Sequence, residues 1–186
     1  MTKERIILGI DPGTNLLGFG VIRINERSKP EYLDCGVLDL RKEKDPYAKL
    51  SRIREQVRDL CAAYKPSDMA VESPFMGKNA QVIFKLGRAQ GAAIIAASQR
   101  CMSVFEYAPR KAKVAITGNG DASKEQVSTM IQKILNVQLD PKHLDATDAL
   151  AIAMCHYYQL TNPLTSLSAS SSWEKFILAN PDRVQK

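Results

Sequence analysis

The sequence has few cysteines, few aromatic residues and no long apolar run. Its four cysteines, Cys35, Cys61, Cys101 and Cys155, are widely spaced and form no CxxC pair. This spacing argues against a disulfide framework and predicts reduced, structural thiols in a cytosolic protein. No apolar stretch reaches the roughly 18 residues that a bilayer crossing needs. The N-terminal stretch "MTKERIILGID" lacks the small-residue cleavage site of a secretory signal. We therefore expect a cytoplasmic protein without a membrane segment.

Acidic residues are also the minority charge. The chain has 26 Lys and Arg against 20 Asp and Glu, a formal net charge of +6. A positive balance favours anionic partners, nucleic acid above all, although many basic proteins bind no nucleic acid. The 186 residues, 45% of them hydrophobic, suffice for one domain with its own core.

The hydrophobic pattern predicts an α/β fold. Residues 5–11, 18–25 and 31–40 have strand patterns separated by turn-rich or polar links, which predicts a three-stranded antiparallel meander. Short apolar runs at 68–72 and 103–107 predict two further strands, and each follows a helical pattern. Strands that first pair antiparallel and then alternate with helices predict a five-stranded mixed sheet with helices on both faces.

Capping signals mark the helix starts. Asp45 and Pro46 fit the N-cap and first position of one helix, and Ser123 and Gln126 have the spacing of a capping box. The remaining predicted helices cover 78–100, a short segment from Pro109, and 144–160. We expect one domain over residues 1–160 and a polar, Ser-rich tail over 161–186, without internal repeats.

Acidic residues stand where two buried strands are predicted to end. Asp11 closes the first strand and Glu72 closes the fourth. If these strands are parallel neighbours, both carboxylates leave the sheet at the same edge. Asp145 and Asp148 are three residues apart at the start of the last helix and share a helix face. The pattern therefore allows four carboxylates to converge.

Converging carboxylates repel one another unless a cation compensates for their charge. Mg²⁺ prefers oxygen ligands, and two such ions about 4 Å apart can activate a water and stabilise the leaving oxygen in phosphodiester cleavage. Each acid also has a purely structural interpretation: Asp11 as a turn residue, Glu72 as a solvated strand end, and the helical pair as partners of the helix dipole. Their joint occurrence favours a site with two Mg²⁺ ions, in which Mn²⁺ would substitute.

Four segments resemble the RuvC-type Holliday-junction resolvases of the ribonuclease-H-like superfamily. They are, in the order found in that family, "ILGIDPGTNLLGFGVI", "VESPFMGKNAQVIFKLGRAQG", "FEYAPRKAKVAITGNGDASKEQV" and "LDATDALAIA", and they cover about residues 5 to 158. The resemblance implies a ribonuclease-H-like fold and a magnesium-dependent homodimer that nicks two opposing strands of a four-way DNA junction. It also implies that Asp11, Glu72, Asp145 and Asp148 are the catalytic metal ligands, and a branch-migration helicase complex is an expected partner.

Aromatic and basic residues near these segments are candidate DNA contacts. Phe75 follows Glu72 by three residues in a loop with Pro and Gly, where an aromatic ring can stack on a base or instead anchor the loop in the core. The candidate phosphate contacts are Lys78, Lys85, Arg88, Arg110, Lys113 and Lys124. A solvated helix face or basic loop would give the same pattern. The resemblance implies that Lys113 and Lys124 contact DNA and assist the chemistry.

Three further residues have two interpretations each. His143 lies two residues before Asp145 and could be a metal ligand or proton shuttle, or a plain loop histidine. Gly87 and Gly91 lie inside the long helix, where each glycine costs about 1 kcal/mol relative to alanine. That cost suggests close approach of another backbone, either within the monomer or, as the resemblance implies, at a subunit interface.

Other functions fit parts of the sequence. "GIDPGT" also resembles the phosphate-binding hairpin of actin-like and sugar-kinase phosphotransferases, but that class needs two such domains and a later glycine-rich adenine-binding segment. A non-catalytic nucleic-acid-binding module would leave the four acids unexplained, and an RNA-processing nuclease would share the fold. The length, the basic segment 110–124 and the Phe75 loop favour a junction endonuclease. A mechanism with two Mg²⁺ ions predicts products with 5′-phosphate and 3′-hydroxyl ends.

Overall fold

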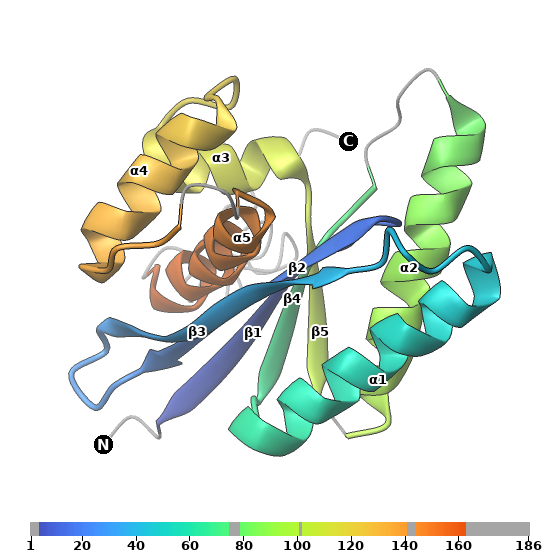
Figure 1. Cartoon of the computed structure of the whole chain (residues 1–186). Coiled ribbons are helices and arrows are strands. Elements are labelled where there is room, and N and C mark those ends of the chain that lie inside the picture. The colour runs from blue at the N-terminus through green and yellow to red at the C-terminus, as the bar shows by residue number, and fades with distance from the viewer. Residues whose placement is uncertain (1–3, 75–78, 101, 141–143, 163–186) are drawn as a thin grey trace, which may run out of the picture.

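A five-stranded mixed sheet forms the centre of the molecule (Figure 1). The computed structural model describes residues 4–74, 79–100, 102–140 and 144–162. The strands lie in the order β3-β2-β1-β4-β5. Their bounds are β1 Arg5–Asp11, β2 Leu16–Ile24, β3 Pro30–Asp39, β4 Asp68–Glu72 and β5 Ser103–Tyr107. The first three strands are antiparallel, as the sequence predicts. β4 pairs parallel with β1 and with β5, which completes a mixed sheet.

Helices cover both faces of this sheet, which confirms the predicted fold class (Figure 1). α1 (Pro46–Tyr64) and α2 (Ala80–Ser98) pack on one face, and α3 (Pro109–Thr117), α4 (Lys124–Leu135) and α5 (Leu144–Thr161) pack on the other. The predicted helices therefore all occur, with boundaries within two residues of the expected ones.

The predicted caps explain two of the helix starts. Asp45 accepts hydrogen bonds from the backbone N–H groups of Tyr47 and Ala48 at the start of α1. At the start of α4, Ser123 and Gln126 form the complete capping box. These side chains satisfy backbone donors that would otherwise lack a partner within the helix.

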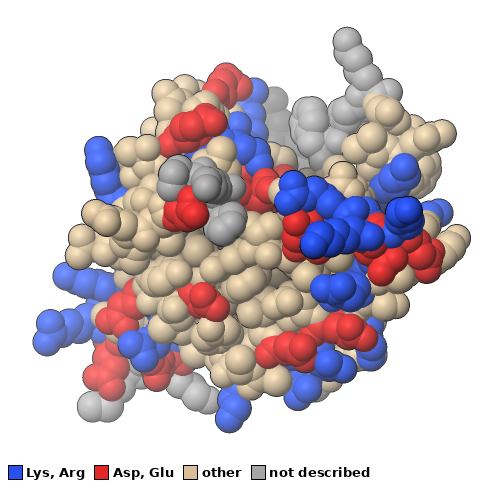
Figure 2. Space-filling model, viewed as in Figure 1, with Lys and Arg blue, Asp and Glu red and all other residues tan. Residues whose placement is uncertain are grey.

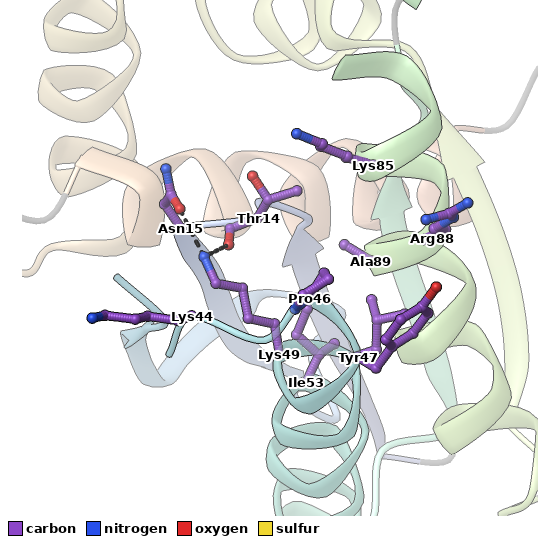
Figure 3. Close-up of a pocket in the computed structure, with 11 residues that line it drawn as sticks. Thr14, Asn15, Lys44, Pro46, Tyr47, Lys49, Ile53, Lys85, Arg88 and Ala89 are labelled. Carbon is purple, nitrogen blue, oxygen red and sulfur yellow. Dashed lines mark hydrogen bonds between the residues drawn. The ribbon is translucent and has the colours of Figure 1, made fainter. Parts of the chain in front are cut away.

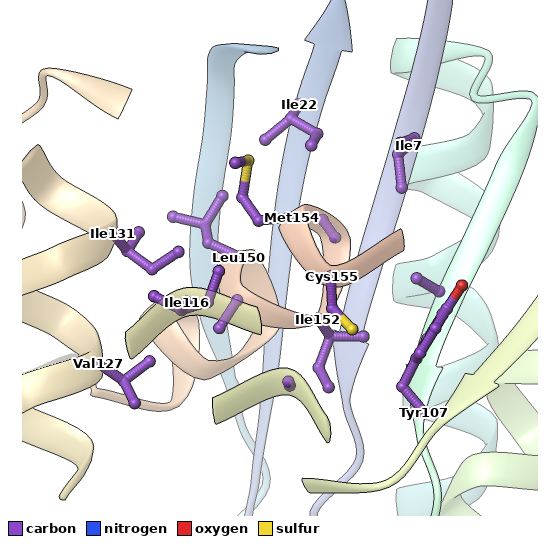
Figure 4. Packing of buried hydrophobic residues seen from close by; sticks show 14 of the residues in the cluster. Ile7, Ile22, Tyr107, Ile116, Val127, Ile131, Leu150, Ile152, Met154 and Cys155 are labelled. Carbon is purple, nitrogen blue, oxygen red and sulfur yellow. The ribbon is translucent and has the colours of Figure 1, made fainter. Parts of the chain in front are cut away.

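Each face of the sheet has its own hydrophobic core. Buried aliphatic residues of β1, β2 and β4 meet α1 and α2 on one side and α3, α4 and α5 on the other. Figure 4 shows the second core, in which Leu150 and Met154 of α5 lie between Ile22 of β2 and Ile131 of α4. Because α5 is buried along most of its length, its position on the sheet is firmly fixed.

Glycines on the strands let α5 approach the sheet very closely. A Cβ atom built on Gly9 of β1 would lie 2.1 Å from the carbonyl oxygen of Ala149, and one on Gly18 of β2 would lie 2.0 Å from that of Asp145. Only glycine fits at such a distance. The first turns of α5 therefore lie directly over the strand end that carries Asp11.

Several predictions fall outside the described residues. They concern Phe75, Lys78, Cys101 and His143, and the tail from residue 163 onward. Of the predicted tail, the structure describes only Thr161, which ends α5, and the residue after it.

Three of the four cysteines lie in the described part of the chain. Cys35, Cys61 and Cys155 are free thiols. None of the helices over the described ranges combines the length and hydrophobicity that a membrane crossing demands.

Candidate active site

Two of the predicted acids leave the sheet side by side. Ile10 of β1 and Val71 of β4 are partners in the parallel register. The next residue on each strand is an acid, Asp11 on β1 and Glu72 on β4. Parallel pairing thus brings to one edge two carboxylates that are far apart in the sequence.

The start of α5 adds two further acids. One ligand oxygen from each of Asp11, Asp145 and Asp148 lies within 4.8 Å of the others, a spacing that could hold a metal ion. Glu72 is outside this group of three, but it lines the same cavity of about 220 Å³ as Asp11 and Asp148. The structure therefore brings together the acids that the sequence singles out, with three of them closer than the fourth.

Burial and repulsion raise the pKa values of Asp11, Glu72 and Asp148. Burial, followed by the charges of Glu72 and Asp148, raises the pKa of Asp11 well above its usual range. Burial and the charge of Asp148 raise the pKa of Glu72 to about 7. Burial also raises the pKa of Asp148, although a hydrogen bond from Lys124 offsets part of the effect. Full ionisation of these three acids is therefore disfavoured unless a cation compensates for their charge.

Lys124 is the cation most closely engaged with the cluster. Its Nζ lies 3.0 Å from Asp145 Oδ1 and 2.6 Å from Asp148 Oδ2. Burial lowers the pKa of Lys124, but its hydrogen bonds to the two acids and the charge of Asp11 outweigh burial and raise it. Since Lys124 is the first residue of α4, this contact also joins the start of α4 to the start of α5.

The other predicted basic contacts occupy three different places. Lys113 lines the acidic cavity and donates a hydrogen bond of 2.7 Å to the carbonyl oxygen of Ala122. Lys85 and Arg88 of α2 line a separate cavity. Arg110 is exposed and lies 3.6 Å from Asp121, and it is not among the residues that line the acidic cavity.

A buried glutamine that the sequence analysis missed supports the end of β4. Gln90 of α2 is 8% exposed. Its Nε2 donates to the carboxylate of Glu106 at 2.8 Å and to the backbone carbonyl of Glu72 at 3.4 Å. The available signal was a polar residue between Ala89 and Ala93 on the face of α2 that packs into the core.

These features define the class of protein. A five-stranded mixed sheet with acids at the ends of its first and fourth strands, completed by acids at the start of its last helix, is the arrangement of the ribonuclease-H-like nucleases.

Comparison with known proteins identifies the family. The family model of the crossover junction endodeoxyribonuclease RuvC matches residues 7–156. The enzyme of that name from Bacteroides fragilis is 49% identical over 185 residues, which are 98% of this chain and 97% of the relative. The chain therefore belongs to the RuvC family of crossover junction endodeoxyribonucleases, as the four segments suggest.

Solved structures agree with this assignment. The RuvC structure from Thermus thermophilus is 32% identical, has a TM-score of 0.73, and is matched over 83% of this chain and 95% of its own. The same organism's RuvC in complex with a Holliday junction substrate is 29% identical, has a TM-score of 0.74, and is matched over 84% of this chain and 96% of its own.

Proposed function

We propose that this junction endonuclease resolves four-way DNA junctions by paired nicking of opposing strands at the acidic cavity. The observation that carries the proposal is the meeting of ligand oxygens from Asp11, Asp145 and Asp148 within 4.8 Å of one another, in a chain of the RuvC family. The complex of a family member with a Holliday junction supports the choice of substrate.

The cavity suits divalent cations. Its acidic side chains offer only carboxylate oxygens, which Mg²⁺ prefers, and their raised pKa values indicate repulsion that bound cations would relieve. We propose that Asp11, Glu72, Asp145 and Asp148 would hold two Mg²⁺ ions, for which Mn²⁺ would substitute. Ions at this place would supply Lewis-acid chemistry, by acidifying water and stabilising charge on the leaving 3′ oxygen.

The basic residues of the cavity have a distinct role. Lys113 and Lys124 line it together with Asp11, so an entering phosphodiester meets two ammonium groups beside the carboxylates. These groups would hold the scissile phosphate and stabilise the charge that develops on it. The products would carry 5′-phosphate and 3′-hydroxyl ends, which a ligase can seal.

DNA contacts outside the cavity complete the substrate site. We place Phe75 and Lys78 near the crossover because they follow Glu72 closely in the sequence. An aromatic ring there would stack on a base. Lys85, Arg88 and Arg110 would contact the phosphate backbone further from the cleaved bond.

A homodimer would supply the second active site that paired nicking needs. Val82, Phe84 and Ile95 of α2 are 49%, 70% and 55% exposed, although they are large apolar residues. A Cβ atom on Gly87 or Gly91 would meet nothing within 4 Å in the described part of the chain, so packing inside the monomer does not explain these glycines. We propose that α2 pairs with a second copy of the chain.

The remaining parts of the proposal concern context. Residues 1–160 would carry the nuclease activity, with 161–186 as an accessory tail, in recombination and DNA repair. The enzyme would act in the cytoplasm, where the free thiols of Cys35, Cys61 and Cys155 would stay reduced. A branch-migration helicase complex would present the junction to it.

A substrate comparison tests the proposed activity. Synthetic four-way junction, linear duplex and RNA–DNA hybrid are each incubated with the protein and Mg²⁺. Paired, symmetric nicks in the junction alone are expected. Equal cleavage of duplex or hybrid would contradict the proposal.

A substitution tests the assignment of the site. Asp11→Asn is expected to retain junction binding and lose cleavage, whereas Asp59→Asn, which removes an exposed acid of α1, serves as the matched control. Cleavage by Asp11→Asn at the wild-type rate would show that the acidic cavity is not the active site.

A further inference from the structure

A second cavity lies beside the same edge of the sheet, on the face that α1 and α2 cover. It has a volume of about 460 Å³ and is formed by the loop after β1, the start of α1 and the N-terminal half of α2 (Figure 3). The acidic cavity, in contrast, is lined on its helical side by residues of α3, α4 and α5. The strand end that carries Asp11 therefore has a cavity on each side.

The lining of this second cavity is strongly basic. It includes Lys44, Lys49, Lys85 and Arg88 and no carboxylate. Several other surface cations of the described chain pair with acids, but no such pair involves Lys44, Lys85 or Arg88 in those ranges. Figure 2 shows Lys and Arg side chains gathered over the region where β3 leads into α1, with Asp and Glu side chains of the same segment among them. Unpaired cations around a concave surface are suited to an anionic ligand.

Lys49 gives the cavity a fixed wall. Its Nζ donates hydrogen bonds of 3.0 Å to the carbonyl oxygen of Thr14 and of 3.0 Å to Asn15 Oδ1 (Figure 3). Asp45, the nearest acid in sequence to the lining residues of α1, is engaged as the N-cap of that helix. The loop after β1 is thereby held against α1, and the other three cations remain available.

An aromatic side chain stands among these cations. Tyr47 lines the cavity and is 69% exposed. Pro46, Leu50, Ile53 and Ala89 form the apolar part of the lining. An exposed aromatic ring within a basic surface is typical of proteins that contact a nucleic-acid strand, since the ring packs on bases or sugars while the cations contact phosphates.

The basic cavity begins close to the proposed reaction centre. Thr14 follows Asp11 by three residues, which span at most about 11 Å. One strand of a duplex advances about 3.4 Å per nucleotide. A strand whose scissile phosphate lies at Asp11 can therefore reach the cavity within about three nucleotides.

We infer that this cavity binds the phosphodiester backbone of a junction arm, a few nucleotides from the cleaved bond. Lys44, Lys85 and Arg88 neutralise the phosphates, and Tyr47 packs against the strand. The inference rests on the proposed function, because it places the scissile phosphate at Asp11. It adds Lys44 and Tyr47 to the substrate site and assigns Lys85 and Arg88 to one shared subsite.

The salt dependence of junction binding tests this subsite. Affinity is measured by fluorescence anisotropy in EDTA, over a range of salt concentrations, for the wild type, Lys44→Glu and Tyr47→Ala. Lys133→Glu, on α4, is the control with the same change of charge. Lys44→Glu is expected to weaken binding about tenfold and to reduce the slope of log K against log salt by about 1. Tyr47→Ala is expected to weaken binding with the slope unchanged. Equal effects of Lys44→Glu and Lys133→Glu would overturn the inference.

Neutral linkages in the DNA locate the contact. Single methylphosphonates are placed at successive positions on the cleaved strand, out to about six nucleotides from the crossover. At the contacted position, a neutral linkage is expected to weaken the wild type and to have no further effect on Lys44→Glu. Additive losses at every position would contradict an arm contact.

A site for free phosphate would give a different result. Inorganic phosphate would then bind the wild type but not Lys44→Glu. The wild type and Lys44→Glu would bind the junction with equal slopes of log K against log salt. This outcome would also overturn the inference. Failure of the wild type to nick the junction would instead contradict the proposed function, and the salt slopes would still decide the role of the cavity.

Discussion

Gly18→Ala is expected to inactivate the enzyme through one methyl group that lies outside the active site. The new Cβ atom would lie 2.0 Å from the carbonyl oxygen of Asp145, whereas ordinary van der Waals contact begins at 3.4 Å. To relieve this overlap, β2 and the first turn of α5 must separate by about 1.4 Å. This turn carries Asp145, and Asp148 follows one turn later. A misplacement of about 1 Å can reduce a catalysed rate about 100-fold.

The assay is single-turnover nicking of a four-way junction at saturating protein and Mg²⁺. Gly20→Ala is the matched control, because its Cβ would press on the side chain and backbone nitrogen of Leu150, deeper in the same helix. Both variants are expected to lose about 1–3 kcal/mol of stability through overpacking. Only Gly18→Ala should lose about 100-fold in cleavage rate while retaining junction affinity in EDTA. Equal rate losses in the two variants would refute the reasoning.

Three further predictions concern the acid at the end of β4, the glutamine that supports it, and an ion pair whose acid is buried. Because folding raises the pKa of Glu72 from 4.5 to about 7, metal-free protein should lose up to about 3 kcal/mol of unfolding free energy as the pH rises through this window. Urea titrations in EDTA should show a larger loss in the wild type than in Glu72→Gln, in which the raised pKa values of Asp11 and Asp148 still contribute; an equal loss in both would contradict it. Gln90→Leu should raise the Mg²⁺ concentration for half-maximal cleavage without changing junction affinity in EDTA, and an unchanged metal requirement would argue against a positioning role. Asp68 is 1% exposed, accepts a hydrogen bond of 2.8 Å from Arg5 and lies 3.6 Å from His156. Asp68→Asn should therefore lower the free energy of unfolding in urea by about 2 kcal/mol, and a change near zero would contradict this.

Strands and helices were predictable where a local pattern decides them. The first, fourth and fifth strands match their predicted ranges because each is a short apolar run bounded by turn or helix signals. The second strand begins at Leu16 rather than at residue 18. Leu16 and Leu17 read locally as part of a turn, but they pair with Asp39 and Leu38 of β3. The two extra residues are in strand conformation because they pair with a neighbouring strand, and local propensity carries no information about that pairing.

The candidate site was predictable to the extent that topology places its residues. The sequence shows two predicted strands that end in acids and an i, i+3 pair of acids on a predicted helix. Parallel pairing of the strands is then enough to bring these acids together. Lys124 was expected to contact DNA and assist the chemistry, and the structure adds a contact that was not predicted, because Lys124 bridges Asp145 and Asp148. The contacts of Gln90 with strands and the basic cavity both depend on how α2 packs against its neighbours, which periodicity alone does not specify.

The central claim is that the carboxylates at the ends of β1 and β4 and at the start of α5 together hold divalent cations. Anomalous scattering from a crystal of the protein soaked in Mn²⁺ tests this claim most directly. Two manganese peaks are expected among Asp11, Glu72, Asp145 and Asp148, and both should be lost in Asp11→Asn crystals. A wild-type map without manganese at these oxygens, under conditions in which the protein nicks junctions, would contradict it.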